Sequence, residues 1–189
     1  MSKQKWKPGN MLYPLPAVLV SCGDREGKIN LMTAAWTGTV CSDPPMVYVS
    51  VRKERFSHHM IQETGEYVIN LTTEELARAT DFCGVRSGKD MDKFKEMHLT
   101  PTFGELQYAP MIVESPVSIE CRVKNVMELG SHDMFVAEVL SIDADEKYID
   151  EKGAFDISKC NLIAYANGGY YSLEKKIGKF GYSVKKKKK

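Results

Sequence analysis

The stretch INLMTAAWTGTVCSDPPMVYVSVRKERFSHHM, residues 29–60, carries the pattern that decides the fold. Within it, Met46–Arg52 alternates strictly and places Val47, Val49 and Val51 on one face. Such alternation is typical of a strand that buries one face and exposes the other. Hydroxyls, small side chains, an aromatic ring and a basic cluster crowd around this strand. The stretch therefore predicts β-structure that also carries a polar, positively charged ligand site.

Further β-rich segments precede and follow this strand. Pro16–Cys22 leads through CGDREGK, whose glycines and aspartate favour a hairpin turn, into Ile29–Met32. Ala34–Cys41 is the next apolar run, and Asp43-Pro44-Pro45 stops it. We expect the first two segments to pair as antiparallel strands.

Short helices are expected between the strands. Phe56–Gln62 resembles a short helix that ends near Gly65, and Glu66–Leu71 returns as a strand. Thr72 or Thr73 caps a second helix that runs through Phe82, because a threonine hydroxyl satisfies free amides in the first helical turn. The pattern is therefore strand, helix, strand, helix.

A polar, irregular segment follows. Gly84 is placed to end the preceding helix, and the chain from Val85 to Ala109 holds one expected short helix, Met91–Met97. This segment is a candidate insertion or lid. Two long β-rich runs come next, Ser115–Leu129 and His132–Asp143, and the Gly-Ser pair between them is a hairpin signal.

Short strands with hairpin turns and three minor helices favour one fold class. We expect a mainly β protein, a closed or nearly closed barrel with helical decorations, rather than a doubly wound sheet. A length of 189 residues fits one domain over 1–189, with a core of about 10–175 and a C-terminal segment 176–189.

Composition and charge are those of an ordinary globular protein with a basic tail. Apolar content of 43% and charged content of 27% are ordinary for a globular protein. The formal charge is +1, but without the run Lys185–Lys189 the 26 basic residues fall to 21 against 25 acidic ones, which gives −4. We expect that run to be a solvated, disordered tail and the body to be mildly acidic.

Cysteine usage and chain hydropathy point to a reduced, soluble setting. The five cysteines, Cys22, Cys41, Cys83, Cys121 and Cys160, form no CxxC pair, so neither a zinc site nor a disulfide framework is indicated. Reduced thiols fit a cytoplasm. The N-terminus lacks an apolar signal-peptide region, and no window approaches the roughly 18 apolar residues of a membrane span.

Several catalytic motifs are absent from the sequence. There is no GxGxxG, GxSxG or HExxH, and the glycine-rich GDREGKI, residues 23–29, departs from a Walker A loop. His58 and His59 would project about 100° apart on a helix, which does not suit a shared metal. No metal site is expected.

The stretch of residues 29–60 is then the candidate for a ligand site. Thr33–Trp36 offers a hydroxyl, small residues and an aromatic wall, which suit a flat ring with polar edges; the alternative is a buried strand whose alanines merely pack. Ser50–Lys53 and Arg55 supply what a phosphate needs, since arginine binds two oxygens at once. The alternative there is a solvated strand end.

Five segments in order resemble the flavin reductase-like family, especially its flavoredoxin branch. These segments are NLMTAAW, DPP with VYVSVRKER, FSHHMIQETGEYVINL, DFCGVRSGKDMDKF and GSHDMFVAEV, and the similarity covers roughly residues 10–175. The resemblance implies an FMN-binding split β-barrel of Greek-key type that forms a homodimer, with flavin near the subunit interface. It also implies electron transfer through FMN from a nicotinamide nucleotide, NADH or NADPH, or from a reduced protein partner.

The resemblance also assigns site residues. Thr33, Ala34, Ala35 and Trp36 would lie along the isoalloxazine edge; Ser50, Val51, Arg52 and Ser57 near the ribityl phosphate; and Asn70, Cys83, Gly84, Ser87, Gly88 and Lys89 would complete the pocket. His132 matches a position near the ring and is the candidate catalytic residue.

Some of these roles have open alternatives. Lys89 is a candidate cation beside reduced flavin, or an exposed lysine in a polar loop. His132 relays a proton or orients a nicotinamide, or it is a strand-end histidine bonded to backbone. Cys83 has no partner cysteine nearby, so its backbone and Gly84 are expected to matter more. Tyr170 and Tyr171 either cover the flavin of a neighbouring subunit or pack a terminal segment.

The leading hypothesis is therefore an FMN-dependent oxidoreductase. The first alternative is an FMN-binding protein without turnover of its own that serves another redox protein. A remote alternative is a β-barrel that binds single-stranded nucleic acid, and the acidic body weighs against it.

Overall fold

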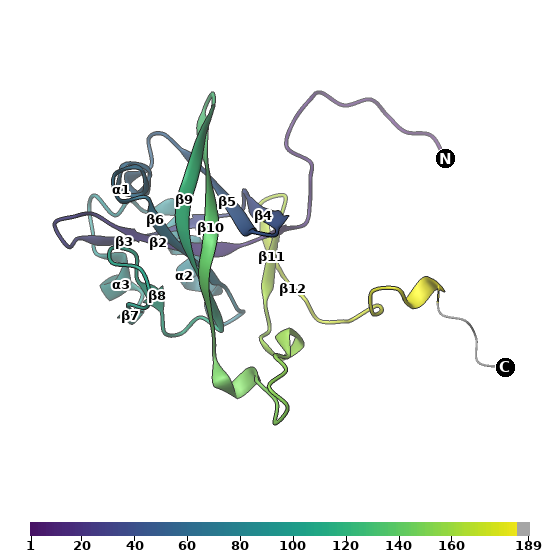
Figure 1. Ribbon diagram of the computed structural model, residues 1–189. Coiled ribbons are helices and arrows are strands. Elements are labelled where there is room, and N and C mark those ends of the chain that lie inside the picture. The colour runs from purple at the N-terminus through teal and green to yellow at the C-terminus, as the bar shows by residue number, and fades with distance from the viewer. Residues whose placement is uncertain (185–189) are drawn as a thin grey trace.

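A curled antiparallel sheet of seven strands forms the body of the computed structural model, which describes residues 1–184 (Figure 1). The tail expected at Lys185–Lys189 lies outside the described residues. In order across the sheet the strands are β3 (Ile29–Ala34), β2 (Val18–Gly23), β6 (Glu66–Leu71), β9 (Val117–Leu129), β10 (His132–Ala144), β5 (Pro45–Arg52) and β4 (Thr37–Ser42).

Smaller elements decorate this sheet. They are a sheet of β1 (Leu15–Pro16), β11 (Ile163–Ala166) and β12 (Gly169–Ser172), a pair of β7 (Pro101–Thr102) and β8 (Met111–Ile112), and the helices α1 (Phe56–Thr64), α2 (Ala77–Val85) and α3 (Lys93–Glu96). Both terminal segments leave the body as arms (Figure 1). Among residues 1–184, no helix has the length and apolarity to cross a membrane.

The two edges of the large sheet are consecutive along the chain. β3 is one edge and β4 the other, yet only Ala35 and Trp36 separate them. A sheet whose edges are joined by two residues has to curl until they meet. The edges do not pair with each other, although the Ser50 amide donates to the Trp36 carbonyl at 2.8 Å. The result is a barrel with a split, and the expectation of a mainly β, nearly closed barrel is confirmed.

The barrel interior is built from alternating strand residues. On β5, Val47, Val49 and Val51 are buried, as the alternation predicts. They pack with the inward faces of the other strands and with α1, in a cluster that also holds Val18, Val20, Cys22, Met32, Ala34, Met60, Ile61, Tyr67, Ile69, Cys121, Phe135 and Ala137. Burial of this apolar surface is the main force that closes the barrel.

A second core lies outside the barrel, beneath α2 and α3. Leu19 and Leu31 point outward from β2 and β3 and meet Leu76, Ala79 and Phe94. This packing fixes both helices beside β3. It therefore brings the end of α2 and the segment after it next to the split.

The helices match expectation in part. α1 ends as expected, because Gly65 has φ 70° and its amide donates to the Ile61 carbonyl. α2 begins at Ala77, later than a cap at Thr72 or Thr73 predicts, although Thr73 Oγ1 does accept from the Leu76 amide at 3.3 Å in the turn before the helix. Thr73 also forms an isolated β-bridge with Leu162, which holds its backbone outside the helix.

Gly84 also differs from expectation. It lies inside α2, which ends at Val85, so it does not terminate the helix. A Cβ at Gly84 would stand 3.2 Å from the Thr33 Cβ. The glycine is therefore placed for close approach between helix and strand rather than for a helix end.

The long hairpin is confirmed. β9 and β10 pair antiparallel around Gly130, whose φ of 74° suits the turn. β10 also pairs with β5, and this register sets His132 opposite Arg52. The expected helix at Met91–Met97 is shorter, because Asp92 caps it through the Lys95 amide at 3.2 Å.

Candidate functional site

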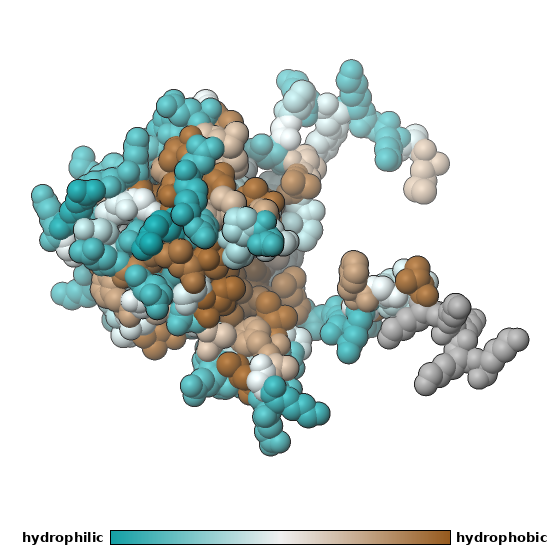
Figure 2. All heavy atoms as spheres, in the orientation of Figure 1, coloured by the Kyte–Doolittle hydropathy of each residue, from teal (hydrophilic) through white to brown (hydrophobic). Residues whose placement is uncertain are grey.

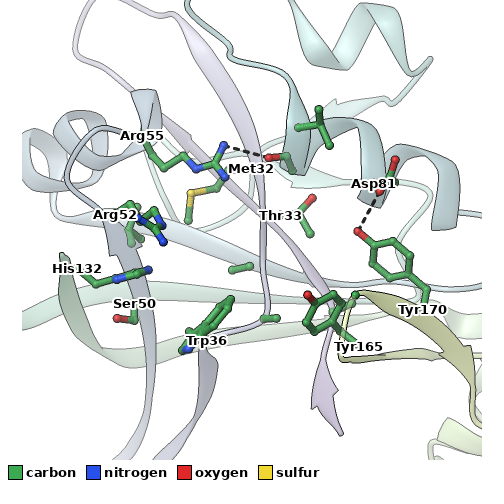
Figure 3. Close-up of a pocket in the computed structure, with 17 residues that line it drawn as sticks. Met32, Thr33, Trp36, Ser50, Arg52, Arg55, Asp81, His132, Tyr165 and Tyr170 are labelled. Atoms are coloured by element: carbon green, nitrogen blue, oxygen red, sulfur yellow. Dashed lines mark hydrogen bonds between the residues drawn. The ribbon is translucent and has the colours of Figure 1, made fainter. Parts of the chain in front are cut away.

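One depression opens at the split of the barrel and is called the main depression, because most of the predicted site residues line it. It has a volume of about 350 Å³, within the range of ligand pockets. Its walls come from the β3–β4 connection, the end of β5, the start of β10, the end of α2, and the small β11–β12 sheet (Figure 3). The residues that line it are Ala17, Met32, Thr33, Ala34, Ala35, Trp36, Ser50, Val51, Arg52, Arg55, Asp81, Gly84, Val85, His132, Tyr165, Gly168 and Tyr170.

One wall of the main depression is flat and aromatic. Trp36 is 42% exposed, and its ring lies 6.1 Å from the His132 ring at an angle of 35°. Ala34 and Ala35 beside it are buried and leave the backbone open to close approach. The Thr33 hydroxyl donates to the Thr80 carbonyl, so toward a ligand its oxygen acts as an acceptor.

The opposite wall holds two tyrosines. Tyr170 lies next to α2, and its hydroxyl donates to Asp81 Oδ1 at 3.4 Å (Figure 3). Burial and the neighbouring Asp81 raise the pKa of Tyr170, so its hydroxyl stays protonated. Tyr165 packs edge-on against it, with centroids 6.0 Å apart. Tyr170 thus lines the depression of its own chain, whereas Tyr171 is 58% exposed.

A second depression of about 330 Å³ adjoins the first. The two share Met32, Arg52 and Arg55 in their linings. The second is lined further by Asn30, Glu54, Phe56, Ser57, Arg86, Ser87, Gly88 and Lys93. Four cationic side chains against one carboxylate give this depression an excess of positive charge, which would attract an anion.

Arg55 stands at the junction of the two depressions. Its Nη1 donates to the Gly84 carbonyl at 3.0 Å, across from the α1 side to the end of α2 (Figure 3). Arg52 reaches the same junction from the end of β5 and pairs with Glu54 at 3.4 Å. Both guanidiniums are exposed enough to turn toward a ligand.

His132 faces the main depression from the start of β10 (Figure 3). Partial burial and the nearby Arg52 hold its pKa below the usual 6.5. Its Nδ1 lies 2.9 Å from the Ser131 hydroxyl. At neutral pH the ring is therefore neutral, with one nitrogen able to donate and the other able to accept.

The structure brings most of the predicted site residues together. Thr33, Ala34, Ala35, Trp36, Ser50, Val51, Arg52, Gly84 and His132 line the main depression, and Ser57, Ser87 and Gly88 line the second. Each group lies at one end of a continuous surface, because Arg52 lines both.

Three predicted residues lie elsewhere. Lys89 lines a separate depression with Lys28, Asp90 and Asp92. Cys83 is fully buried, and burial raises the pKa of its thiol to about 11. Its thiol is therefore not a ready nucleophile.

Asn70 is also away from both depressions. It is fully buried, and its amide donates to Ser21 Oγ at 3.0 Å and accepts from Ser118 at 2.8 Å and from the Ile112 amide at 3.0 Å. These bonds join β2, β6, β9 and β8. The side chain therefore holds strands together on the side of the second core.

Other lining residues escaped the sequence analysis. Asp81 and Tyr165 carry no local signal, because only the packing of α2 and β11 brings them to the split. Arg86 and Lys93 lie in the quoted segment DFCGVRSGKDMDKF, but that segment has no periodicity to show which side chains face inward. Burial of Lys93, at 4% exposure, distinguishes it from Lys89, the other lysine of that segment.

Comparisons with known proteins agree with this geometry. The sequence model of the flavin reductase like domain matches residues 11–174. The chain is similar to flavoredoxin of Desulfovibrio vulgaris, at 32% identity over 97% of this chain and 100% of that one, with a TM-score of 0.90. Flavoredoxin from Methanosarcina acetivorans is 31% identical, with the same coverage and a TM-score of 0.86.

A more distant structure has the same fold. A protein with a split-barrel domain from Shewanella frigidimarina is 22% identical over 89% of this chain and 86% of that chain, with a TM-score of 0.80. It supports the split-barrel architecture drawn from the open edge between β3 and β4.

Proposed function

We propose, since the chain belongs to the flavin reductase-like family and to its flavoredoxin branch, that it binds FMN across the two joined depressions and transfers electrons through it. One observation carries the proposal. A depression with a flat aromatic wall adjoins a cationic one, and Arg52 and Arg55 line both. A flavin ring with a phosphate on a short chain has the same two ends.

The residues present fit this cofactor. Thr33–Trp36 and His132 would border the ring, and Ser57, Ser87, Gly88 and the arginines would hold the phosphate. A Cβ at Gly88 would overlap the Asn30 side chain, so the backbone there runs close to a polar group of the second depression. When bound, FMN supplies reversible one- and two-electron transfer.

The chain's own residues then have separate tasks. Tyr165 and Tyr170 shield one side of the main depression from water. His132 is neutral at pH 7, so it can hold or pass a proton at the ring edge; burial first, and then Arg52, lower its pKa. These roles make His132 the candidate catalytic residue of an oxidoreductase.

Absorbance tests the binding step. Purified protein is incubated with FMN, desalted and scanned; the expected result is a retained flavin spectrum. A protein that stays colourless after this treatment overturns the proposal.

The electron donor is a nicotinamide nucleotide or a reduced protein partner. Rapid anaerobic bleaching of the FMN-loaded protein by NADH or NADPH supports the flavin reductase activity. Bleaching only by a reduced redox protein instead supports the second candidate, an FMN-binding partner protein, which the similarity to two flavoredoxins favours. We place this reaction in the cytoplasm, where the five free cysteines stay reduced.

A homodimer is also part of the proposal. Large apolar side chains are exposed, among them Trp36 of the main depression, Val40 on β4 and Tyr171 on β12. Figure 2 shows apolar residues gathered near the centre of the face in view and toward the side from which the arms leave. Such a patch is typical of a protein interface. Light scattering that gives the mass of a single chain contradicts the dimer.

A further inference from the structure

Two terminal arms leave the body of the molecule on the same side (Figure 1). The N-terminal arm, residues 1–12, leads into β1, and the C-terminal arm, residues 175–184, follows β12; both strands belong to the small sheet around β11. Within the described chain, no hydrogen bond or ion pair joins either arm to the body. The side chains of the arms are therefore free to meet a partner.

Both arms carry large apolar side chains that the body does not bury. Each of them is more than half exposed, and none belongs to a hydrophobic cluster of the described residues. They are Trp6, Met11 and Leu12 in the N-terminal arm and Ile177, Phe180, Tyr182 and Val184 in the C-terminal arm. Exposed apolar side chains gathered on one side of a protein are typical of a surface that binds another body.

Positive charge is concentrated in the same two arms. Residues 1–12 and residues 175–184 each contain three lysines and no acidic residue, and five more lysines follow in the sequence at 185–189. Of the 26 basic residues, 11 lie in these segments, so residues 13–174 hold 15 basic residues against all 25 acidic ones, which gives −10. The formal charge of +1 thus belongs to an acidic body with basic arms.

The face of the body between the two arms is apolar. A depression of about 270 Å³ lies there, since Pro14 and Leu15 at the end of one arm and Leu173 at the start of the other line it. Its other lining residues are Pro16, Ala17, Val18, Leu71, Thr72, Leu162, Ile163 and Ala164, so no charged side chain of the described chain lines it. At this place the acidic body does not present carboxylates that would repel a negatively charged surface.

We propose that the two arms bind the protein to a membrane surface that contains anionic lipid. Lysines are attracted to acidic headgroups, while aromatic and aliphatic side chains enter the boundary between headgroups and acyl chains. A single apolar anchor gives only marginal binding, and a basic patch beside it makes the binding stable. The inference does not depend on FMN binding, so each can be tested without the other.

A lipid surface fits the arms better than a folded protein or a nucleic acid does. The C-terminal arm has one short 3₁₀ turn, Tyr182–Val184, and Gly178 and Gly181 precede it. A protein groove selects side chains at a fixed spacing, whereas a fluid bilayer accepts them at any spacing. Bases of a nucleic acid stack on aromatic rings, but Ile177 and Val184 are aliphatic.

Sedimentation with vesicles tests the role of charge on the full chain. We expect binding to vesicles of phosphatidylcholine mixed with phosphatidylglycerol, none to phosphatidylcholine alone, and release at high salt. Replacing Lys175, Lys176 and Lys179 together by Gln should weaken binding about 10- to 100-fold. The control replaces three exposed lysines of the body, Lys95, Lys147 and Lys152, by Gln and should weaken binding less than about 3-fold.

A second pair of variants tests the apolar side chains. Ile177→Ser combined with Phe180→Ser should weaken binding to the mixed vesicles about 10-fold, because apolar area no longer enters the bilayer. Val113→Ser combined with Ile157→Ser, at exposed apolar residues of the body, should not weaken it.

Tryptophan emission tests the N-terminal arm. In Trp36→Leu, Trp6 is the single tryptophan of the chain. Its emission should shift to shorter wavelength when the mixed vesicles are added, because the indole leaves water for the headgroup boundary. Emission that stays unchanged while the protein sediments with the vesicles removes the N-terminal arm from the proposed surface.

Several outcomes would overturn the inference as a whole. Equal binding to both kinds of vesicle, or binding to neither, contradicts it. Equal losses in the arm and body lysine variants would show that only net charge matters. If vesicles do not bind and the Ile177 and Phe180 variant turns a dimer into a monomer in light scattering, the arms cover a second copy of the chain. Retention by DNA without lipid binding assigns them to nucleic acid.

Discussion

His132 and Arg52 are direct partners across the β10–β5 pair, at the mouth of the main depression. Two adjacent basic groups disfavour a charge on the weaker base. Burial first, and then Arg52, lower the pKa of His132, while Glu54 opposes them. Arg52 therefore has two tasks in the proposed site. It offers a guanidinium to the ligand, and it adds to the lowering of the His132 pKa that burial begins.

Replacement of Arg52 should change the titration of His132. In Arg52→Ala the repulsive charge is gone, so the pKa of His132 should rise toward 6.5, while the part caused by burial stays. Proton NMR of the histidine Cε1–H signal against pH measures this. Arg25→Ala, at an exposed arginine paired with Glu63, is the matched control. A His132 pKa that stays the same or falls in Arg52→Ala contradicts the assigned cause.

The same variant should bind FMN more weakly. If Arg52 makes charge-assisted bonds to the phosphate, Arg52→Ala should cost about 1.5 to 3 kcal/mol of binding free energy. Fluorescence titration of FMN measures the change, with Arg25→Ala again as control. Unchanged affinity removes Arg52 from the site.

Sequence patterns predicted the strands well, because a strand with one buried face has an apolar residue at every second position. Val47, Val49 and Val51 on β5 and the hairpin at Gly130 are both local signals. The start of α2 was missed because a tertiary contact decided it: the bridge from Thr73 to Leu162 joins residues far apart in the chain. A local capping signal does not contain that contact.

The candidate site also has one part that local sequence patterns predicted and one part that they did not. Thr33–Trp36 and Ser50–Arg52 were predictable because they flank the strands that meet at the split. The second depression was not, since the segment between α2 and α3 has no regular period. Lys89 and Lys93 have equal charge in sequence, and only the packing of α3 under β3 shows which one is buried.

A methyl group at Gly88 should damage the second depression. Gly88→Ala would drive its Cβ into the Asn30 side chain, whose Nδ2 donates to Ser57 Oγ at 2.8 Å. We expect a loss of about 1 to 3 kcal/mol in the free energy of unfolding and weaker FMN binding. Urea unfolding and FMN titration measure the two effects.

Gly9→Ala is the control for that substitution. Nothing lies within 4 Å of a Cβ at Gly9, so neither stability nor FMN affinity should change. Equal behaviour of the Gly88 and Gly9 variants would show that the loop at Gly88 moves freely and does not shape the depression.

Stability should depend on pH through Asp133. This buried carboxylate accepts from His58 Nε2 at 2.8 Å and lies 3.3 Å from Lys53 Nζ. Burial alone would raise the pKa of Asp133, but the hydrogen bond from His58 and the positive charge of Lys53 outweigh it and hold the pKa below 3.8. The carboxylate therefore stabilises the fold above about pH 3.8, and this contribution disappears as pH falls through the lower folded pKa.

Asp133→Asn should accordingly be less stable than wild type at pH 7, and the gap should narrow below pH 3.8. Urea unfolding of both proteins at pH 7 and pH 3 measures the gap. Asp143→Asn, at an exposed carboxylate on the same strand, is the control and should show little gap at either pH. A gap for Asp133→Asn that stays constant with pH rules out the carboxylate as its source.

Trp36 should report ligand binding directly. The chain has two tryptophans, and Trp36 lines the main depression while Trp6 is 72% exposed in the N-terminal arm. A flavin ring against the indole should quench Trp36 emission. Loss of the indole in Trp36→Leu should weaken FMN binding by about 1 kcal/mol, because the aromatic packing is lost. Trp6→Leu should keep both the quenching and the affinity. The opposite result would be quenching that survives in Trp36→Leu and vanishes in Trp6→Leu. The flavin would then quench the emission of Trp6, so the ring would lie near the N-terminal arm. This result would contradict a ring site between β3 and β5.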